Sequence, residues 1–373
     1  CTGWDTVQLF VNPLIPVSVS ISASANPVCA GTPVTFTATA VLGGSSPVYQ
    51  WKVNTSNVNN ANNAVFTYNP LPGDQVSCVM ISNLACVINN PVTSNSIMMS
   101  PSPVPVVTFT RCFDSITATN AKPINLKGGL PLGGTYSGPG VNSATGIFDP
   151  AIAGPGTHLI TYSFTNIYTC ISSATTRVFN FQFSIFNCGS LLTDIRDNHQ
   201  YRTFALTNGK CWMAENLDFG FEISDLIPQT DNCIEEKYIR NSSFNVQYSI
   251  FQWDELLRYD PTPGSQGLCP PGWHVPTTAE WDELLSFLNG PGQAGGPIKD
   301  TLLVNGFHSF QQGFLYQNNT WACTTGLTAG SMYWTSTPSG SRAIARGLNE
   351  YTPSVSFYSA SRVNGFGVRC TRD

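Results

Sequence analysis

The first half of the chain alternates hydrophobic and polar residues over short segments bounded by turn residues. The segment Val34–Ala40, VTFTATA, alternates with a period of two, and turn sequences such as Gly43-Gly44 and Pro72-Gly73-Asp74 separate such segments. This pattern is typical of short antiparallel strands. It predicts β-sandwiches of about 85 residues each, with Trp51 as a core aromatic residue.

The pattern also repeats along the chain. Cys29 and Cys112 each precede an alternating strand, about eighty residues apart, and Cys1, Cys86 and Cys170 are each followed by a closing strand. We therefore expect a first sandwich over 15–102, a second over 103–188, and in 1–14 either the terminal strand of a preceding unit or a donor strand.

The strand predicted in residues 1–14 needs a partner, because a lone strand with an apolar face is rarely left in water. Its apolar face would hold Val7, Leu9 and Val11, with Phe10 on the reverse. It belongs either to an absent sandwich or to the sheet of a neighbouring molecule, as in donor-strand fibres. A lipid anchor on Cys1 is the third possibility.

The second half changes to a helical period in one place. Thr277 and Glu280 form a capping box, Trp281, Leu284, Leu285 and Leu288 share one face, and Gly290 ends the pattern. We expect one amphipathic helix there and a weaker one over 248–259.

Charge and cysteine content narrow the class of protein. Charged residues make up 10% of the chain and the net charge is −5, so nucleic acid is not an expected partner. No apolar stretch is long enough to span a bilayer. Twelve cysteines without a CxxC pair indicate disulfides made in an oxidising compartment, so we expect an extracellular or cell-surface protein. Most charges and six of the eight Trp follow residue 190, which places a domain boundary near 188–190.

Four motifs of the second half resemble the FISUMP family, the Fibrobacter succinogenes major paralogous domain. They are DIRDNHQYRTFALTNGKCWMAENL at 194–217, CPPGWHVPTTAEW at 269–281, YWTST at 333–337 and GFGVRC at 365–370. The resemblance implies that 189–373 is an α+β domain of the formylglycine-generating-enzyme and C-type-lectin group, with a twisted sheet, one or two helices and long loops.

The first half resembles the immunoglobulin-like repeats of very large secreted surface proteins of Bacteroidota, through CAGTPVTFTA, YQWKVN and GDQVSCVMISNLAC, and through residues 133–164. The expected fold class is mainly β, with tandem immunoglobulin-like sandwiches before the C-type-lectin-like domain. The repeated positions indicate Cys29–Cys86 and Cys112–Cys170 bridges, with Cys78 unpaired or competing with Cys86. The full set of disulfide candidates is Cys29, Cys86, Cys112, Cys170, Cys188, Cys211, Cys233, Cys269, Cys323 and Cys370.

Catalysis is not expected. The acidic pairs Glu235-Glu236, Asp254-Glu255 and Asp282-Glu283 fit solvated faces, because adjacent residues do not converge on one substrate atom. His274 fits a structural position beside the helix cap. Cys323 and Cys370, where a formylglycine-type oxidase would need thiols, lie in contexts typical of disulfides. No metal, catalytic residue or cofactor is expected.

Ligand binding is a better functional candidate than catalysis, and the resemblance to C-type-lectin-like folds implies that it uses the long loop region, about 306–346. Aromatic residues with Arg are the usual anchors of recognition, and the alternative is that the aromatic residues are core. The candidates are Phe314, Tyr316, Trp321, Tyr333, Arg342 and Arg346. Thr6, Ser115 and Thr301 lie in Asp-Ser/Thr-apolar motifs of the kind that carry O-glycans in secreted Bacteroidota proteins.

These patterns favour a secreted adhesin or extracellular fibre subunit, whose expected partner interaction is self-association into fibres or into a longer surface protein. A lectin-like module that binds glycan or protein without assembly is the alternative, and a cysteine-dependent enzyme is the third. Strands crossing between molecules would favour the fibre, exposed aromatic and Arg residues around a pocket the lectin, and a close reduced cysteine pair the enzyme.

Overall fold

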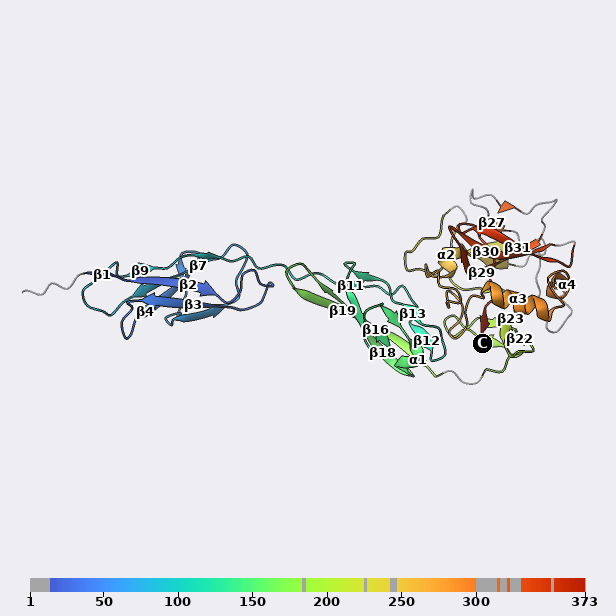
Figure 1. The fold of residues 1–373 in the computed structure, drawn as a ribbon, viewed down its shortest axis with the longest axis horizontal. Coiled ribbons are helices and arrows are strands. Elements are labelled where there is room, and N and C mark those ends of the chain that lie inside the picture. The colour runs from blue at the N-terminus through green and yellow to red at the C-terminus, as the bar shows by residue number, and fades with distance from the viewer. Residues whose placement is uncertain are drawn as a thin grey trace, which may run out of the picture. The chain divides into compact units, whose positions relative to one another are not determined.

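The computed structural model describes residues 14–182, 186–224, 227–241, 247–299, 314–315, 321–322, 330–349 and 352–372. These residues are mainly β. The chain divides into two compact units (Figure 1). Unit 1 comprises Cys1–Val106 and Phe164–Ser172, and unit 2 comprises Val107–Ser163 and Ser173–Asp373. Unit 2 thus holds most of the second sandwich together with the whole C-terminal domain.

The first sandwich consists of two sheets around one core. One sheet has the order β2 (Ser18–Ala23), β3 (Val34–Val41), β6 (Val65–Tyr68). The other has the order β10 (Ile97–Met98), β7 (Gln75–Ile81), β4 (Val48–Val53), β5 (Ser56–Asn57), and β9 (Val92–Thr93) also pairs with β7. A short parallel pair joins β1 (Ile15–Pro16) to β8 (Val87–Ile88).

The alternation of the strands decides which side chains fill this core. In β7 the buried residues are Val76, Cys78 and Met80, which alternate with more exposed ones. Trp51 is completely buried, as predicted, and its indole nitrogen donates to the carbonyl of Asn63 at 2.9 Å. That bond satisfies the one polar group that the ring brings into the core.

The second sandwich has one larger sheet, built on the two long strands β18 (Gly156–Thr165) and β19 (Ile171–Phe181), and several smaller elements. Its larger sheet has the order β12 (Ile116–Ala118), β19, β18, β15 (Thr135–Ser137). The smaller elements are the sheet β13 (Ile124–Asn125), β17 (Ile147–Phe148), β16 (Val141–Asn142), the pair β11 (Thr108–Phe109) and β14 (Gly129–Leu130), and helix α1 (Pro150–Ala153), capped by Asp149.

The C-terminal domain is built from several small sheets. The longest antiparallel sheet is β29 (Gly330–Ser339), β30 (Arg342–Asn349), β31 (Val355–Ser361). Two other sheets have three strands each: one is β22 (Thr203–Ala205), β23 (Cys211–Met213) and β32 (Thr371–Arg372), and the other is β24 (Phe221–Glu222), β25 (Glu236–Asn241) and β26 (Gln247–Ile250). Two strand pairs complete the set: β20 (Leu192–Thr193) with β21 (Gln200–Tyr201), and β27 (Phe314–Leu315) with β28 (Trp321–Ala322). Its helices are α2 (Trp253–Leu256), α3 (Thr278–Phe287) and α4 (Gly295–Lys299).

Helix α3 is the predicted amphipathic helix, and its capping box is present. Thr277 accepts from the backbone N–H of Glu280 at 3.2 Å, and Glu280 accepts from that of Thr277 at 2.7 Å. Trp281 lies with its ring centroid 5.3 Å from that of Trp212 on β23, so the helix covers the β22–β23 sheet (Figure 1). The extent predicted for the weaker helix, 248–259, is wrong. Residues 247–250 form β26 and pair with β25, and the helical part is α2, Trp253–Leu256.

The disulfide pairing differs from the pairing expected from the repeats. The structure has Cys29–Cys170, Cys112–Cys233, Cys188–Cys211 and Cys269–Cys370. The expected Cys29–Cys86 and Cys112–Cys170 bridges are therefore wrong. Cys86, which was expected to form a disulfide, is a free and exposed thiol. Cys78 is also free, but it is buried. Cys1 and Cys323 lie outside the described residues. Cysteines at repeated positions bond across module boundaries, so comparison of the repeats could not identify their partners.

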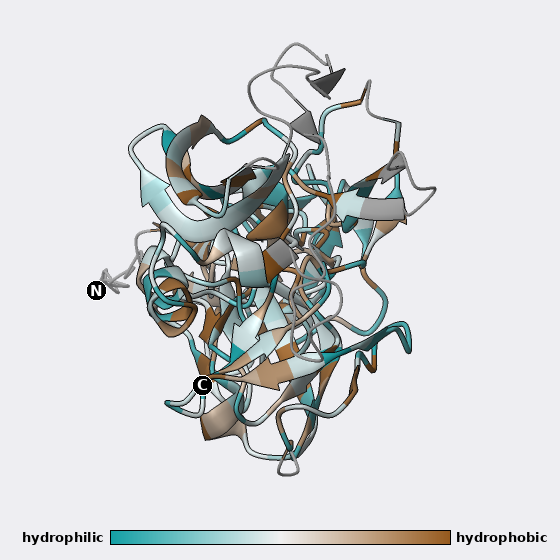
Figure 2. Cartoon of the chain, turned by 90° about the vertical axis from the view of Figure 1, so that its right-hand side faces the viewer, coloured by the Kyte–Doolittle hydropathy of each residue, from teal (hydrophilic) through white to brown (hydrophobic). Residues whose placement is uncertain are grey.

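In the part of the chain that the structure describes, no helix has the length and apolar character needed to cross a membrane. Figure 2 shows hydrophobic and hydrophilic residues interspersed along the same strands and helices. The apolar residues are thus used to fill separate small cores rather than one long segment.

Candidate functional site at the junction of the second sandwich and the C-terminal domain

Asp114 is the central residue of the junction inside unit 2. It lies just before β12, between Phe113, which is part of the second-sandwich core, and Ser115, whose carbonyl accepts from the N–H of Phe179 at 2.8 Å. These contacts fix the backbone of Asp114 to the sandwich. The residue is buried, 8% exposed, and all its side-chain partners come from the C-terminal domain.

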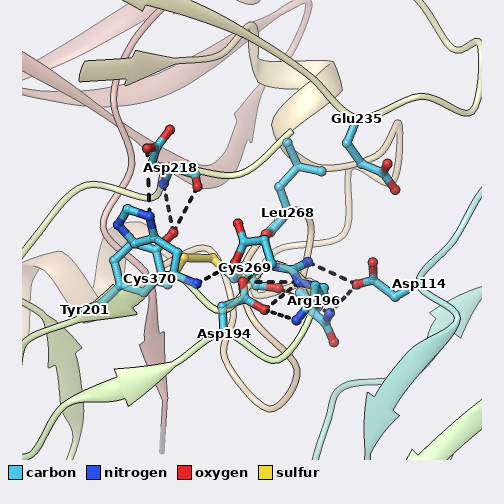
Figure 3. Close-up of polar contacts among 12 residues, drawn as sticks. Asp114, Asp194, Arg196, Tyr201, Asp218, Glu235, Leu268, Cys269 and Cys370 are labelled. Carbon is cyan, nitrogen blue, oxygen red and sulfur yellow. Dashed lines mark hydrogen bonds and ion pairs between the residues drawn. A yellow bond between two sulfur atoms is a disulfide. The ribbon is translucent and has the colours of Figure 1, made fainter. Parts of the chain in front are cut away.

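Arg196 is the first of these partners (Figure 3). Its guanidinium donates from Nη1 to Oδ2 of Asp114 at 3.2 Å, and from Nε and Nη2 to both oxygens of Asp194, at 2.9 and 2.6 Å. Nη2 also donates to the carbonyl of Leu268 at 2.9 Å, and the guanidinium lies 3.7 Å from the centroid of the Phe219 ring. The buried guanidinium of Arg196 is thereby paired with two carboxylates, one from Asp114 and one from Asp194.

The charge of Arg196 is secured by these carboxylates. Burial alone works to lower the pKa of the guanidinium, but the charges of Asp114 and Asp194 and the hydrogen bonds from Asp194 outweigh burial and raise it. The arginine therefore stays protonated at every pH at which the protein is folded.

Two further side chains complete the shell around Asp114. Arg258 donates from Nη2 to Oδ1 at 2.5 Å and also pairs with Glu235 at 3.1 Å. Gln266 donates from Nε2 to Oδ2 at 2.9 Å. One carboxylate of the sandwich therefore holds three separate segments of the C-terminal domain, around residues 196, 258 and 266.

A disulfide and a second polar group support the same junction. Cys112 is bonded to Cys233, which lies in the segment between β24 and β25. Lys127 donates to the carbonyl of Arg258 at 3.0 Å, and Asn125 donates to the side chain of Asp260 at 2.9 Å. The sandwich and the C-terminal domain are thus joined by a covalent bond, a buried ion-pair cluster and a set of peripheral hydrogen bonds.

A cavity of about 340 Å³ adjoins the cluster. Phe219 contributes an aromatic ring, while Arg111 and Glu235 contribute opposite charges. The lining residues are Arg111, Phe113, Asp114, Ser115, Ile116, Arg196, Phe219, Cys233 and Glu235. A pocket with two aromatic rings and a few polar groups is suited to a small polar ligand.

The acidic pairs are less exposed than expected. Glu236 and Glu255 are buried, 7% and 4% exposed, so the expectation of solvated faces is wrong for these two. Glu255 accepts from the backbone N–H of Glu236 at 2.9 Å. Burial, followed by the charge of Glu236, raises the pKa of Glu255 to about 7.

The predicted loop residues do not form one binding surface among the described residues. Tyr333 is completely buried, and its ring lies 5.7 Å from that of Trp281. Arg346 is buried and pairs with Asp282 of α3 at 2.5 Å. These two residues pack against or hold α3, so the expectation that they are exposed anchors is wrong. Arg342 is exposed and donates to the carbonyl of Ser359 at 2.6 Å.

The remaining predicted positions are only partly described. Phe314 and Trp321 lie in β27 and β28, for which only the strand pairing is described. Ser115 is partly exposed beside Asp114. The predictions on Tyr316, on the assembly strand with Val7, Leu9, Phe10 and Val11, on Cys323, and on the glycosylation sites Thr6 and Thr301 fall outside the described residues.

His274 has a structural role beside the helix cap, as expected. It is buried, and Nε2 lies 2.8 Å from Oε1 of Glu280, which also pairs with Lys210 at 3.0 Å. Although burial works against ionisation, the contacts with His274, Thr277 and Lys210 lower the pKa of Glu280 to about 2. No group of three or more His, Cys, Asp or Glu side chains suited to a metal occurs within the described ranges.

Sequence reasoning missed Asp114 as a junction residue. It had singled out the position only through the Asp-Ser-Ile motif. The sequence does hold one signal, the scarcity of acidic residues: the first 190 residues contain only four Asp and no Glu. A carboxylate in so uncharged a segment is rarely incidental, but its partners lie 82, 144 and 152 residues away and no local pattern identifies them.

Comparison with known proteins bears on the C-terminal part of the chain. The family model of the Fibrobacter succinogenes major domain matches residues 207–372. No curated protein matches the sequence.

Three solved structures of bacterial adhesins show weak similarity. A Ca²⁺-stabilized adhesin that helps an Antarctic bacterium reach out and bind ice aligns at 13% identity and TM-score 0.30, over 54% of this chain and 63% of that chain. A 1.5-MDa bacterial ice-binding adhesin aligns at 10% identity and TM-score 0.22, over 64% and 96%. The Yersinia pseudotuberculosis adhesin InvE aligns at 12% identity and TM-score 0.21, over 95% and 97%. Similarity of this degree carries no argument about the function of this chain.

Proposed function

Because residues 207–372 form a Fibrobacter succinogenes major domain, we propose that the chain is a secreted cell-surface protein with a structural and adhesive role. In this proposal the two sandwiches are immunoglobulin-like spacers, and the C-terminal domain is the head of an adhesin or of an extracellular fibre subunit. The chain is not an enzyme.

The observation that carries the proposal is the placement of two disulfides. Cys29 of the first sandwich is bonded to Cys170, between β18 and β19, and Cys112 of the second sandwich is bonded to Cys233 of the C-terminal domain. Bonds that stabilise one small domain connect residues within it. Bonds that connect successive modules instead carry load from one module to the next, as a spacer under tension requires.

The Asp114 cluster supports the same role. A buried carboxylate shared by Arg196, Arg258 and Gln266 fixes the head to the last spacer at several points. A catalytic site would use such groups on a substrate, whereas here each of these contacts is made within the chain. Cys370, one of the thiols that a cysteine oxidase would need, is bonded to Cys269.

The strand order of the first sandwich supports the immunoglobulin-like assignment of the spacer. Strands β2, β3 and β6 form one sheet, and β4, β5, β7 and β10 form the other. Immunoglobulin sandwiches divide their strands between two sheets in this manner.

The test is attachment under flow. Cells that produce the protein, cells that lack it, and cells with the double change Cys112→Ser and Cys233→Ser are compared on a host or biofilm surface at rising shear. We expect the protein to be labelled by antibody on intact cells, and the double variant to detach at lower shear while attaching normally without flow. Absence of surface label, or equal attachment of cells that lack the protein, would overturn the proposal.

The cavity beside Asp114 favours a second candidate, a lectin-like module that binds a small polar ligand without assembly. Phe219, whose ring Arg196 covers on one side, offers apolar surface for a sugar. Arg111 and Glu235 offer groups for its hydroxyl or carboxylate substituents. Glycan-array binding that is lost with Phe219→Ala, with no filaments seen by electron microscopy, would favour this candidate over the adhesive fibre.

A further inference from the structure

Two disulfides of this chain follow one rule. Cys29 lies five residues before β3 and Cys112 lies four residues before β12, so each occupies the same place at the start of its sandwich. Each is bonded to a cysteine in a connecting segment further along the chain, Cys170 before β19 and Cys233 before β25. The rule joins the early cysteine of one module to a segment of the module that follows.

Cys86 occupies in the first sandwich the place that Cys170 occupies in the second. The sequence Ile81–Cys86, ISNLAC, matches Phe164–Cys170, FTNIYTC, apart from one inserted residue. Each cysteine ends a connection that leaves a long strand, β7 or β18, and each is followed at once by the next strand, β8 or β19. Cys170 is bonded to Cys29, yet Cys86, the matching residue, is an exposed free thiol.

The surroundings of Cys86 resemble an uncovered contact surface. Leu84 and Ile88, on either side of it, are 40% and 39% exposed. Strand β1 pairs with β8, so the chain enters the first sandwich beside Cys86, with Leu14 and Ile15 61% and 47% exposed. Exposed apolar residues gathered around a point of chain entry are typical of an interface.

We propose that Cys86 is the attachment point for another sandwich module of the same type, which forms a disulfide to it from the position equivalent to Cys29. The partner is a module that presents a thiol before its own second strand and covers Leu84 and Ile88. This inference concerns how modules are linked, and it does not depend on adhesion.

The bond forms by thiol–disulfide exchange with an oxidised dithiol carrier. One cysteine, as its thiolate, attacks a sulfur of the carrier disulfide and releases a carrier thiolate. The second cysteine, also as thiolate, then attacks the resulting mixed disulfide, which closes the new sulfur–sulfur bond. The carrier takes up the two electrons and, through solvent, the two thiol protons, and it leaves as a dithiol.

Cys78 does not compete for this bond. It is completely buried in the sandwich core, and burial raises its pKa to about 11. A buried, protonated thiol is inert toward disulfide exchange. Of the two free cysteines among the described residues, Cys86 is thus the reactive one.

The test uses the full chain with a second copy of residues 14–106 inserted after Val106, oxidised in a glutathione buffer. The upstream copy then offers Cys29 to Cys86 of the downstream copy. We expect half of the Cys86 peptide to be linked to the Cys29 peptide by mass mapping without reduction, and the other half to react with maleimide. Complete maleimide labelling of Cys86, or its pairing with any other cysteine, would overturn the proposal.

The matched control carries Cys29→Ser in the upstream copy only, and here all of the Cys86 peptide should become labelled. Folding is verified by the Cys29–Cys170 and Cys112–Cys233 peptides. Should the enlarged chain fail to fold, the variant Cys170→Ser, which frees Cys29 in the natural chain, gives a second test. It should form covalent dimers through Cys29–Cys86 that disappear with the additional change Cys86→Ser, and monomers alone would contradict the proposal.

Discussion

Arg196 and Asp114 form a buried ion pair, with Nη1 and Oδ2 3.2 Å apart, that joins the C-terminal domain to the second sandwich. Their side chains are 5% and 7% exposed, so neither charge can return to water when the other is removed. Breaking such a pair is costly, because the buried Arg196 then keeps Asp194 as its single counter-charge.

Removing the carboxylate charge should therefore weaken unit 2. We expect Asp114→Asn to lower its free energy of unfolding by about 3–5 kcal/mol, since Arg196 and Arg258 both lose a counter-charge. Differential scanning calorimetry should show the transition of unit 2 moving down by on the order of 10 °C.

The matched control is an exposed carboxylate at the same junction. Asp231 is half exposed and lies 3.5 Å from Lys127. Asp231→Asn should cost less than about 1 kcal/mol, because water replaces the exposed pair. Equal effects of the two substitutions would contradict the assignment of Asp114 as the central residue.

Glu255 predicts a pH dependence of stability. Its pKa of about 7 in the folded chain exceeds its ordinary value of 4.5, so the folded state binds the proton more tightly. The corresponding contribution, about 3 kcal/mol, is complete below pH 4.5 and is lost as pH rises through 7. Thermal melts of unit 2 at pH 4.5 to 8 should show this decline.

The variant Glu255→Gln isolates that effect, because the amide oxygen can still accept from the N–H of Glu236. We expect a flatter pH profile and a melting temperature above that of the natural chain at pH 8. A profile with the original slope would show that other groups produce the decline.

The disulfides predict how far the chain extends under force. A path from end to end through Cys29–Cys170, Cys188–Cys211 and Cys269–Cys370 includes about 110 residues, so the oxidised chain should extend by no more than about 400 Å. The reduced chain of 373 residues should reach about 1,300 Å. Single-molecule pulling with and without reductant measures both lengths, and equal lengths would contradict the observed pairing.

Two glycines of the second sandwich separate steric from conformational effects. Gly128 and Gly133 have φ of +94° and +92°, but a Cβ on Gly128 would lie 1.6 Å from the carbonyl oxygen of Thr110, whereas one on Gly133 would have no atom within 4 Å. We expect Gly133→Ala to cost about 1–2 kcal/mol from the φ angle alone. Gly128→Ala should cost several times more and disturb the adjacent Cys112, as calorimetry and disulfide mapping would show.

Local patterns predicted the local elements well. Trp51 is in a sandwich core and Thr277 caps α3, because each depends on residues a few positions away or on a strand's own alternation. Patterns of this kind fix which face of an element is buried.

The junction could not be predicted in the same way. The partners of Cys29 and Cys112 are 141 and 121 residues away, and Arg196 and Arg258 are 82 and 144 residues from Asp114. The environment of Glu255 likewise depends on β25, because Glu236 of that strand donates to its side chain. A prediction that treats 248–259 as one helix does not include this contact. Comparison of the repeats identified equivalent positions correctly but assumed that each module closes on itself.

The pairing of Cys29 with Cys170 constrains the order in which the chain folds as it is synthesised. When the first sandwich has emerged, Cys29 and Cys86 are both present, but the proper partner of Cys29 follows Cys86 by 84 residues of chain. A disulfide formed between Cys29 and Cys86 at that stage would be non-native. The first sandwich must therefore fold with its cysteines still reduced, or an isomerase must reopen an early error, before synthesis of the second sandwich supplies the thiol that completes the first.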